Sequence, residues 1–337
     1  MTGGSQVFQI LTFHKGMKKL LIVFACLFIA NTLSTNNASF PADSPLLTFN
    51  SANFHFSTGS ALKFDMNFRS IVREKLYHAF EETYGADSVW FISKRSSKDG
   101  LTFQKRGSSL LQRGPEGSFD RYGQADPTVI MEGPNDWKMW FDALDSQRKW
   151  SSIGYATSKD GETWVKHGPV LDKGNILDWD GKSIHHPVCI KWKGLYYMFY
   201  SGSSVNDPHI VKNIGVAIST DGVHFFKFSE NPIVVTGSDW DRNYVRPSRP
   251  VLINGVWYMF YWGYNGIERS IGIATSQDLL HWTKQGKLFG SCFTEDSSPF
   301  NNPTASDVMI RNNKIQLWYS TYTNSGSYLH FATCDIP

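Results

Sequence analysis

Cysteine is scarce in this sequence. Four cysteines occur among 337 residues, and none lies at a spacing from other cysteines or histidines that is typical of a metal site. Cys189 lies in an apolar segment, so we expect a buried thiol there. Cys292 and Cys334 flank the C-terminal repeat described below and are a candidate disulfide. The cysteines therefore argue against a zinc protein and against a small disulfide-stapled fold.

Long apolar runs are also scarce. The run at 20–30 is directly preceded by two lysines and followed by the polar segment 31–39. This order is typical of a secretory signal peptide, and the run is shorter than the roughly 20 residues that span a bilayer. We predict a signal peptide within residues 1–38 and no membrane segment in the mature chain.

Two details of this segment leave alternatives. Met17 is a second candidate start, so residues 1–16 are interpreted as an extension of the natural chain. Cys26 follows a poor lipoprotein signal, so a lipid anchor is the less favoured alternative to release. We therefore expect a secreted or periplasmic protein.

An excess charge of one sign is absent from the mature chain. The net charge of +3 comes from Lys15, Lys18 and Lys19, which leave with the signal peptide, while the 30 acidic residues all remain. Basic and acidic residues are then equal in number. Neither a nucleic acid nor an anionic membrane surface is indicated as a partner.

What the chain does contain is a repeat, which we call the turn segment. It consists of an apolar run, a Ser-x-Asp-Gly cluster and an aromatic residue. Full copies occupy 154–164, 215–225 and 272–282, and a looser copy occupies 96–103. Its aspartate recurs once per copy, so we interpret these carboxylates as turn scaffolding rather than as catalytic groups. In the last full copy Leu279 replaces the glycine, so that turn must differ.

A second recurring segment is a pair of strands. An apolar run that follows a polar residue and a proline leads through a short turn to an aromatic-rich strand, as at 126–141, 186–200 and 249–261. With the turn segment it makes a four-stranded antiparallel unit of the size of a propeller blade. The units lie at about 60–110, 120–170, 180–235, 243–290 and 298–337. We predict an all-β fold, a single five-bladed β-propeller of four-stranded antiparallel blades over residues 39–337. A β-sandwich is the alternative.

In a propeller the first strand of each blade surrounds a central channel. Aligning Phe80 with Phe141 without a gap places Asp65 opposite Asp126. The residues that begin the first strands, here called rim residues, are then Asp65, Asp126, His186, Arg249 and Asn302. We expect these polar groups to converge on one small volume.

The two rim carboxylates suit glycoside hydrolysis. One can activate water as a general base, while the other holds the geometry and shifts the pKa of a neighbour. A third group must protonate the leaving oxygen, and His186 offers a side chain that titrates at mildly acidic to neutral pH. We predict Asp65, Asp126 and His186 as the catalytic residues. Further acid candidates are Glu81, Glu82 and Glu268.

The candidates for substrate binding lie near the same rim. Guanidinium forks bind carboxylate or phosphate groups in a bidentate manner, so Arg246 and Arg249 suggest an anionic substrate. An ion pair that holds blades together is the alternative for these arginines. The other candidates are Asn302, Asp180, His185 and Trp262. Asp180 belongs to a Trp-Asp pair that can equally anchor a loop.

These features resemble the five-bladed propeller glycosidases, namely glycoside hydrolase families 43, 32 and 68 and the related families 117 and 130. The resemblance covers about residues 60–337 and rests on three motifs. They are Asp-Pro-Thr-Val-Ile at 126–130, Tyr-Met-Phe-Tyr at 197–200 and 258–261, and Ala-Thr-Ser-Lys-Asp-Gly-Glu-Thr-Trp at 156–164.

The resemblance implies roles for the rim. Family 43 uses Asp, Asp and Glu on successive blades as base, pKa modulator and acid, so Asp65 is similar to the base and Asp126 to the modulator. The acid position holds His186 instead of Glu, which leaves open a histidine acid, an acid from another loop or a lost activity. Family 130 phosphorylases hold phosphate with basic residues, to which Arg246, Arg249 and His186 are similar. Some related propellers hold a Ca²⁺ in the channel, and the sequence neither indicates nor excludes one here. Apart from this ion we expect no cofactor and no metal.

We therefore predict a secreted glycoside hydrolase that cleaves a poly- or oligosaccharide, with an acidic one favoured by the arginines. Two alternatives stay open: a non-catalytic carbohydrate-binding propeller and a glycoside phosphorylase. The expected partner is a carbohydrate substrate, and we expect a monomer.

Overall fold

The computed structural model describes residues 47, 49, 54–57, 63–64, 68–85, 87, 89–104, 107–147, 149–206, 212–290, 303–323 and 326–336. Within this part of the chain the regular structure is β-strand, and we find no helix with the length and apolarity to cross a membrane. The predicted signal peptide and the predicted site residues Asp65 and Asn302 lie outside the described residues.

Inner and outer strands differ in burial. In β11 (Leu195–Ser203) all nine residues are buried, as expected for an apolar strand that is covered on both faces. The outer strand β9 (Trp164–Asp172) mostly alternates between exposed and partly buried residues, because one of its faces meets solvent. The aromatic-rich repeats therefore form the interior of the molecule.

The strands form four hydrogen-bonded sheets. The first contains β3 (Phe68–Arg73), β4 (Tyr77–Tyr84), β5 (Trp90–Ser97), β6 (Gly123–Gly133), β7 (Asp136–Leu144), β8 (Trp150–Ser158) and β9. The second contains β10 (Ser183–Trp192), β11, β12 (Asn213–Ser219) and β13 (Phe226–Lys227). The third contains β14 (Tyr244–Arg246), β15 (Val251–Ile253), β16 (Val256–Met259), β17 (Trp262–Tyr264), β18 (Arg269–Ser276) and β19 (Thr283–Gly290). The fourth contains β1 (His55–Ser57), β2 (Lys63–Phe64), β20 (Thr304–Arg311), β21 (Lys314–Thr323) and β22 (Gly326–Asp335).

The first sheet consists of two units. Its strands β5 and β6 meet through a single parallel bridge, Trp90 with Gly123, whereas the other neighbouring strands of this sheet are antiparallel. The groups β3–β5 and β6–β9 are therefore separate antiparallel units that touch at an edge. The predicted all-β class and antiparallel blades are confirmed, while the number of blades stays a prediction.

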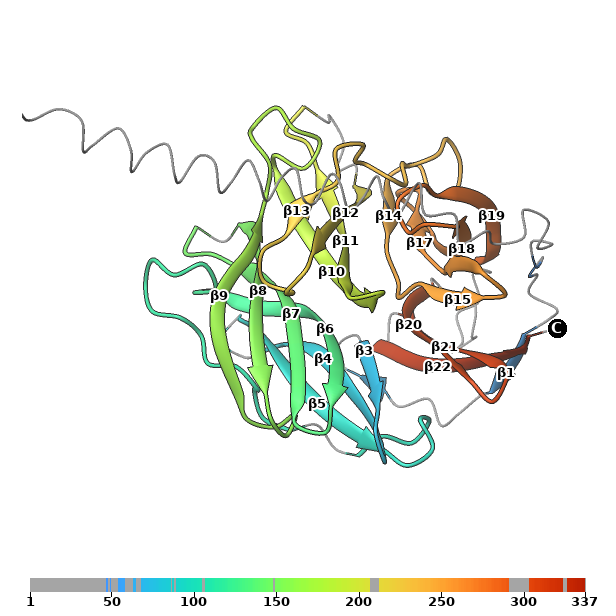
Figure 1. Ribbon diagram of the computed structural model, residues 1–337, viewed down its shortest axis with the longest axis horizontal. Coiled ribbons are helices and arrows are strands. Elements are labelled where there is room, and N and C mark those ends of the chain that lie inside the picture. The colour runs from blue at the N-terminus through green and yellow to red at the C-terminus, as the bar shows by residue number, and fades with distance from the viewer. Residues whose placement is uncertain are drawn as a thin grey trace, which may run out of the picture. The chain divides into compact units, whose positions relative to one another are not determined.

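The units contact one another in a ring. β3 contacts β6, β6 contacts β10, and β12 contacts β14. β15 contacts β20, and β20 contacts β3, which closes the ring. In Figure 1, β3, β6, β10 and β20 come together in the middle of the view. The first strands of the units thus surround a common centre, as a propeller requires.

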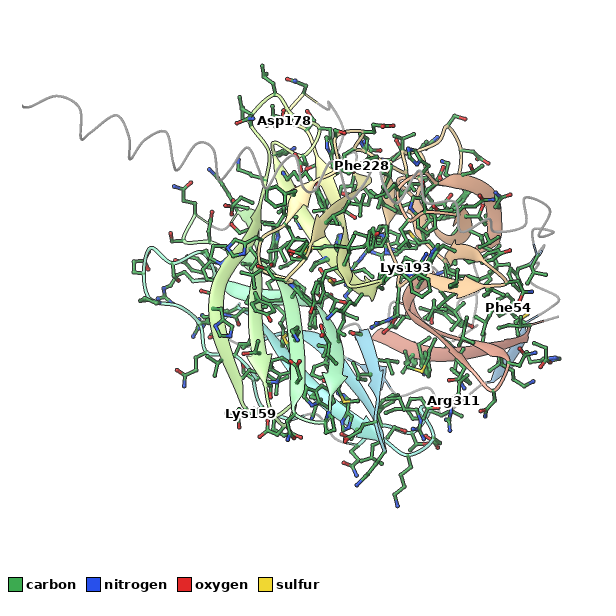
Figure 2. All side chains as sticks on the ribbon, in the orientation of Figure 1. Phe54, Lys159, Asp178, Lys193, Phe228 and Arg311 are labelled. Atoms are coloured by element: carbon green, nitrogen blue, oxygen red, sulfur yellow. The ribbon has the colours of Figure 1, made fainter. Side chains whose placement is uncertain are left out.

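Side chains fill the layers between neighbouring units (Figure 2), and two tryptophans show why the turn segment needs glycine. Trp140 Nε1 donates a hydrogen bond of 2.9 Å to the carbonyl of Gly222, and Trp318 Nε1 donates one of 2.7 Å to that of Gly100. A Cβ on these glycines would lie 3.1 and 3.2 Å from the two indoles, and their φ angles are +79° and +78°. The glycine is therefore required both by its own backbone and by the tryptophan of the adjacent unit.

Leu279, which replaces that glycine in one copy, keeps the left-handed backbone with φ of 71°. Its side chain is fully buried in a cluster that includes Phe199. Phe199 corresponds to Trp140 of the preceding unit. Each of the two residues directly precedes the residue that pairs with the first glycine of the turn segment. A smaller aromatic residue thus leaves room that the leucine fills.

A Leu279→Gly variant tests this compensation. We expect it to lower the free energy of unfolding by about 2 kcal/mol, because deleting a buried leucine costs about 2–5 kcal/mol and relief of the left-handed backbone returns about 1 kcal/mol. Urea unfolding measures the change. The double variant Phe199→Trp, Leu279→Gly recreates the tryptophan-on-glycine pair and should recover most of the loss. A double variant less stable than Leu279→Gly alone would contradict the compensation.

The aspartate of the turn segment acts as the repeat predicts. Asp99 Oδ1 accepts the hydroxyl of Ser97 and the backbone N–H groups of Leu101 and Thr102, each at 2.7–2.8 Å. These bonds, above all that from Thr102, lower the pKa of Asp99 to about 2. The same pattern recurs in the other copies, so these carboxylates are scaffolding.

Two cysteines are described, and both are buried free thiols, Cys189 and Cys334. The expectation for Cys189 is confirmed. Cys292, the candidate disulfide partner of Cys334, lies outside the described residues.

Candidate functional site

The first strands of the units are interrupted at corresponding places. Bulges lie between Phe68 and Ser70 in β3, Ala125 and Thr128 in β6, His185 and Val188 in β10, and Ala305 and Asp307 in β20. At two of them Asp126 and His186 adopt positive φ values of 45° and 57°. A bulge re-aims a side chain, so these interruptions direct side chains towards the shared centre of the ring.

A cavity of about 240 Å³, here called the central pocket, lies at these bulges. Its lining residues are Arg69, His186, Ser201, Lys212, Tyr244, Val245, Arg246, Trp262, Arg269 and Thr304. Half of them carry basic side chains, two are large aromatic residues, and no acidic residue of the described chain is among them. This composition favours an anionic group bound beside an aromatic ring.

Asp126 lies directly behind the basic residues of the central pocket and is almost fully buried. Its Oδ1 forms ion pairs with Arg246 and with Arg69 Nε, the latter at 2.6 Å, and its Oδ2 lies 3.5 Å from His186 Nε2. Burial opposes ionisation, but Arg246 and Arg69 outweigh it and hold the pKa of Asp126 below its usual value. Asp126 is therefore a carboxylate at neutral pH.

Asp142, a carboxyl group next to Asp126, has a raised pKa instead of a lowered one. It is 1% exposed, and its Oδ1 accepts the backbone N–H of His186 at 2.8 Å. Its Oδ2 has no N–H or O–H donor among the described residues. Burial, together with the negative charge of Asp126, raises the pKa of Asp142 well above its usual value. Two neighbouring carboxyl groups thus have pKa values that are pushed apart.

The two histidines beside this pair are neutral. Burial and the charge of Arg246 hold the pKa of His186 well below its usual value, and burial and Lys212 do the same for the pKa of His185. His186 therefore carries no imidazolium proton near neutral pH, which speaks against the predicted histidine acid. Lys212 supplies an ammonium group to the pocket. Burial lowers its pKa to about 8, so it is mostly charged at pH 7.

Comparison with known proteins gives this site a context. Residues 205–335 match the glycoside hydrolase family 130 model, described as β-1,4-mannooligosaccharide phosphorylase. A 1,2-β-oligomannan phosphorylase of Thermoanaerobacter sp. (strain X514) is 25% identical over 159 residues, or 44% of this chain and 53% of that protein. The alignment thus spans about half the length of this relative.

Solved structures extend the likeness over most of the chain. The β-1,2-mannobiose phosphorylase from Listeria innocua, in complex with β-1,2-mannobiose, superposes with a TM-score of 0.62 at 13% identity over 84% of this chain and 91% of that one. A family 117 glycoside hydrolase of the marine bacterium Zobellia galactanivorans gives a TM-score of 0.59 at 15% identity over 84% and 90%. These likenesses show that the chain has the fold of the β-propeller glycoside hydrolases.

Within this fold, the rim of the first unit is not the one inferred from sequence. Ser70 pairs with Phe80 as Thr128 pairs with Trp140, so Phe80 corresponds to Trp140 rather than to Phe141. The gapless alignment that placed Asp65 opposite Asp126 is therefore wrong, because the first hairpin is shorter. Arg69 stands at the bulge, and Asp65, outside the described residues, keeps its role as base only as a prediction.

Arg249 does not line the central pocket. Its position in the register corresponds to Thr128 and Asp307, beyond the bulge, and its Nε and an Nη donate to Asp307 at 2.8 and 3.1 Å. The same Nη donates to Ser70 at 3.1 Å. The predicted substrate contact is thus replaced by an ion pair that joins neighbouring units, the alternative that the sequence left open.

Asp180 is likewise a structural residue. It is 1% exposed, and its Oδ2 accepts hydrogen bonds from the Tyr200 hydroxyl at 3.0 Å and from Lys227 Nζ at 2.6 Å. Asp241 repeats this arrangement with Tyr261 and Lys284 in the next unit. A contact that recurs in successive units anchors a loop, so the predicted substrate contact of Asp180 is corrected.

The other predicted residues lie at or near the pocket. Arg246, Trp262 and His186 line it, and His185 lies behind His186, with Nε2 at 2.9 Å from the Ser183 hydroxyl. Asn302 lies outside the described residues. A larger hollow of about 750 Å³ along residues 107–114 contains none of the predicted site residues, so the site is assigned to the central pocket.

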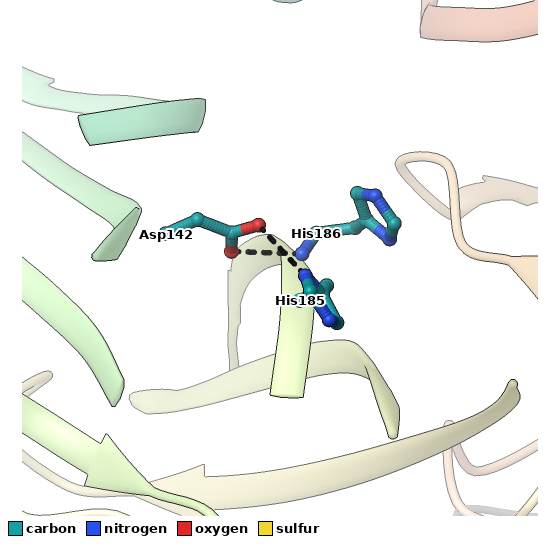
Figure 3. A group of neighbouring side chains, drawn as sticks. All are labelled: Asp142, His185 and His186. Atoms are coloured by element: carbon teal, nitrogen blue, oxygen red, sulfur yellow. Dashed lines mark hydrogen bonds and ion pairs between the residues drawn. The ribbon is translucent and has the colours of Figure 1, made fainter. Parts of the chain in front are cut away.

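Asp142, His185 and His186 bring metal-ligand atoms within 4.8 Å of one another. Figure 3 shows that Asp142 contacts the backbone amide of His186, while the His186 ring points away from the aspartate. His186 Nε2 instead lies beside Asp126. These directions do not converge on one ion, so we assign no metal to this group.

Sequence reasoning missed Arg69, Lys212, Asp142, Tyr244 and Arg269. For Asp142 a signal existed, because it directly follows the repeated aromatic strand, as Ser201 and Trp262 do in the next two units. For Lys212 none existed, since it lies between repeats and reaches the pocket only through the closure of the ring.

Proposed function

We propose that this protein is a glycoside phosphorylase that cleaves mannose-containing oligosaccharides with inorganic phosphate. The observation that carries the proposal is the gathering of Arg69, Lys212, Arg246 and Arg269 around one small cavity. Guanidinium and ammonium groups are the usual protein partners of phosphate. The sugar is inferred from the family 130 model and the oligomannan phosphorylase to which the chain is similar.

Phosphate suits this pocket better than water as the nucleophile. An inverting hydrolase needs a carboxylate base to activate water. No acidic side chain of the described residues lines the pocket, and Asp126 behind it is a weakened base because two arginines hold it ionised. Phosphate arrives already anionic, so it needs cations to hold it and no base.

The pocket also offers a surface for the sugar. Tyr244 and Trp262, which both line the pocket, pack edge to face with ring centroids 6.4 Å apart. The indole N–H of Trp262 is buried and has no acceptor among the described residues. A sugar hydroxyl can accept this hydrogen bond while the phosphate occupies the basic side.

The test is turnover of β-1,2- and β-1,4-mannobiose with and without inorganic phosphate. We expect mannose and mannose 1-phosphate to form when phosphate is present, and negligible cleavage in its absence. Anion-exchange chromatography separates the two products. Equal cleavage without phosphate would refute phosphorolysis in favour of hydrolysis, and binding without any turnover would favour a carbohydrate-binding propeller.

Hydrolysis of an acidic oligosaccharide is the second candidate. The predicted signal peptide favours it, since inorganic phosphate is seldom abundant outside the cell, and a uronate or sulfate group on the sugar would satisfy the same arginines. Cleavage of uronate-bearing oligosaccharides in phosphate-free buffer, with neutral mannobiose untouched, would support this candidate.

A further inference from the structure

We propose that Asp142 and Asp126 share one proton and together form the general acid that protonates the leaving sugar, with Asp142 holding the proton at rest. The inference rests on the proposed cleavage of a glycosidic bond, but it holds for either nucleophile, since both reactions must protonate a leaving oxygen. Asp142 would then be a positioning residue that acts through Asp126.

The position of Asp142 in the fold has a counterpart that shows what is unusual about it. Glu82, near the end of β4, accepts the backbone N–H of Asp126 at 3.2 Å, just as Asp142, near the end of β7, accepts the backbone N–H of His186 at 2.8 Å. Both carboxylates thus hold the backbone of the next bulge. The second oxygen of Glu82 is bound by Arg69, whereas the second oxygen of Asp142 meets no donor among the described residues.

A proton resolves this unsatisfied oxygen. An ionised carboxylate oxygen buried without a donor is costly. Asp126 directly follows Ala125, which pairs with Asp142 across β6 and β7, and both aspartates contact His186. A proton on Asp142 Oδ2 that is donated to Asp126 satisfies both groups and removes the repulsion of two buried negative charges.

The surroundings decide where this proton rests. Arg246 and Arg69 contact Asp126, whereas the nearest ion-pair partner of Asp142 within the described part of the chain is a neutral His185 at 3.7 Å. The titratable and charged groups that face the pair from the neighbouring strands and loops are Arg69, Glu82, His185, His186, Lys212 and Arg246. The two guanidinium groups contact Asp126, so the negative charge stays there and the proton stays on Asp142.

During cleavage the proton moves twice. Asp142 passes its proton to Asp126, and Asp126 passes it on to the glycosidic oxygen as the bond between that oxygen and the anomeric carbon breaks. A phosphate oxygen supplies the electron pair for the new bond to the anomeric carbon. The products are the free sugar hydroxyl, a glycosyl phosphate and an Asp126–Asp142 pair that has lost one proton, which solvent restores.

The experiment compares two leaving groups in an Asp142→Asn variant. The asparagine oxygen can still accept the His186 amide and its NH₂ can donate to Asp126, so the fold is kept while the proton is lost. On mannobiose, whose leaving sugar needs protonation, we expect turnover to fall by about 10²-fold or more. On 2,4-dinitrophenyl β-mannoside, whose leaving group needs no proton, we expect a fall of less than about threefold. In the wild-type protein, turnover of mannobiose should decline as pH rises through the pKa of the pair, and dinitrophenyl release should lack this decline.

Two controls keep the result specific. Glu82→Gln alters the equivalent carboxylate and should change turnover of both substrates by the same factor. Infrared difference spectra should show a protonated carboxyl band at neutral pH that is absent from Asp142→Asn, with no substrate needed. Equal losses on the two substrates in Asp142→Asn, or a band that persists in it, would overturn the shared proton. Wild-type turnover that is independent of phosphate would refute the phosphorylase but not the acid pair.

Discussion

An Asp126→Asn variant is expected to turn over mannobiose about 10²–10⁴ times more slowly than the wild-type protein, the range that removal of a general acid typically costs. Asp126 contacts Arg69, His186 and Arg246, which all line the central pocket. An asparagine there cannot relay a proton. The KM for phosphate should stay the same or fall, because the variant removes a negative charge that competes with phosphate for the two arginines.

The matched control for this variant is Asp180→Asn. Asp180 is equally buried and pairs with a cation, Lys227, but it lies in a loop anchor away from the central pocket. The Asp180→Asn variant should have a lower free energy of unfolding in urea, while its turnover remains near that of the wild-type protein. Initial rates over a matrix of phosphate and mannobiose concentrations separate kcat from KM. Full turnover in Asp126→Asn, or a loss in Asp180→Asn of similar size, would remove the assignment of Asp126.

The fold was largely predictable because its signals are local and repeated. The turn segment specifies its own hydrogen bonds through Ser97 and Asp99 and their equivalents, independently of the rest of the chain. The replacement of glycine by Leu279 also marked a real structural difference, which depends on the smaller Phe199 in the adjacent unit. Four copies of one local rule gave the antiparallel units in their correct order.

The site was less predictable because it depends on register. The first hairpin is shorter than the gapless alignment assumes, and this puts Arg69 at its bulge. Arg249 lies only three residues from Arg246, yet it falls in the interruption between β14 and β15 and pairs with Asp307. No sequence pattern states where a bulge ends, so neighbouring arginines with the same local composition acquire different roles.

The protonation states could not be predicted at all from the sequence. His186 was a reasonable acid from its residue type alone. Its surroundings, however, combine burial with cations from Arg69, Lys212 and Arg246, which belong to three other parts of the chain, and these hold its pKa well below the usual value. We therefore assign the acid role to the carboxyl pair of Asp126 and Asp142 rather than to the imidazole of His186. The sequence repeat did not indicate Asp142.

Asp307→Ala is expected to cause the largest loss of stability, about 3 kcal/mol. Breaking a buried ion pair costs about 3–5 kcal/mol, and we expect the lower end of this range because the side chain of Arg249 is 21% exposed. Asp307 accepts both guanidinium bonds of Arg249 and the backbone N–H of Ile71, so it joins the last unit to the first and closes the ring. The exposed pair of Asp335 and Lys314 lies in the same sheet, and Asp335→Ala should cost far less stability because solvent screens this pair.

The double variant Arg249→Met, Asp307→Leu separates the two parts of this effect. It removes the ion pair without leaving a buried charge, so its free energy of unfolding should lie above that of Asp307→Ala. Urea unfolding followed by tryptophan fluorescence measures all three variants. A loss in Asp307→Ala no greater than that in Asp335→Ala would mean that the ring is closed by apolar packing around Trp318 rather than by this ion pair. Because neither Arg249 nor Asp307 lines the central pocket, the folded fraction of each variant should keep its turnover, which ties Arg249 to the closure of the propeller and not to the substrate.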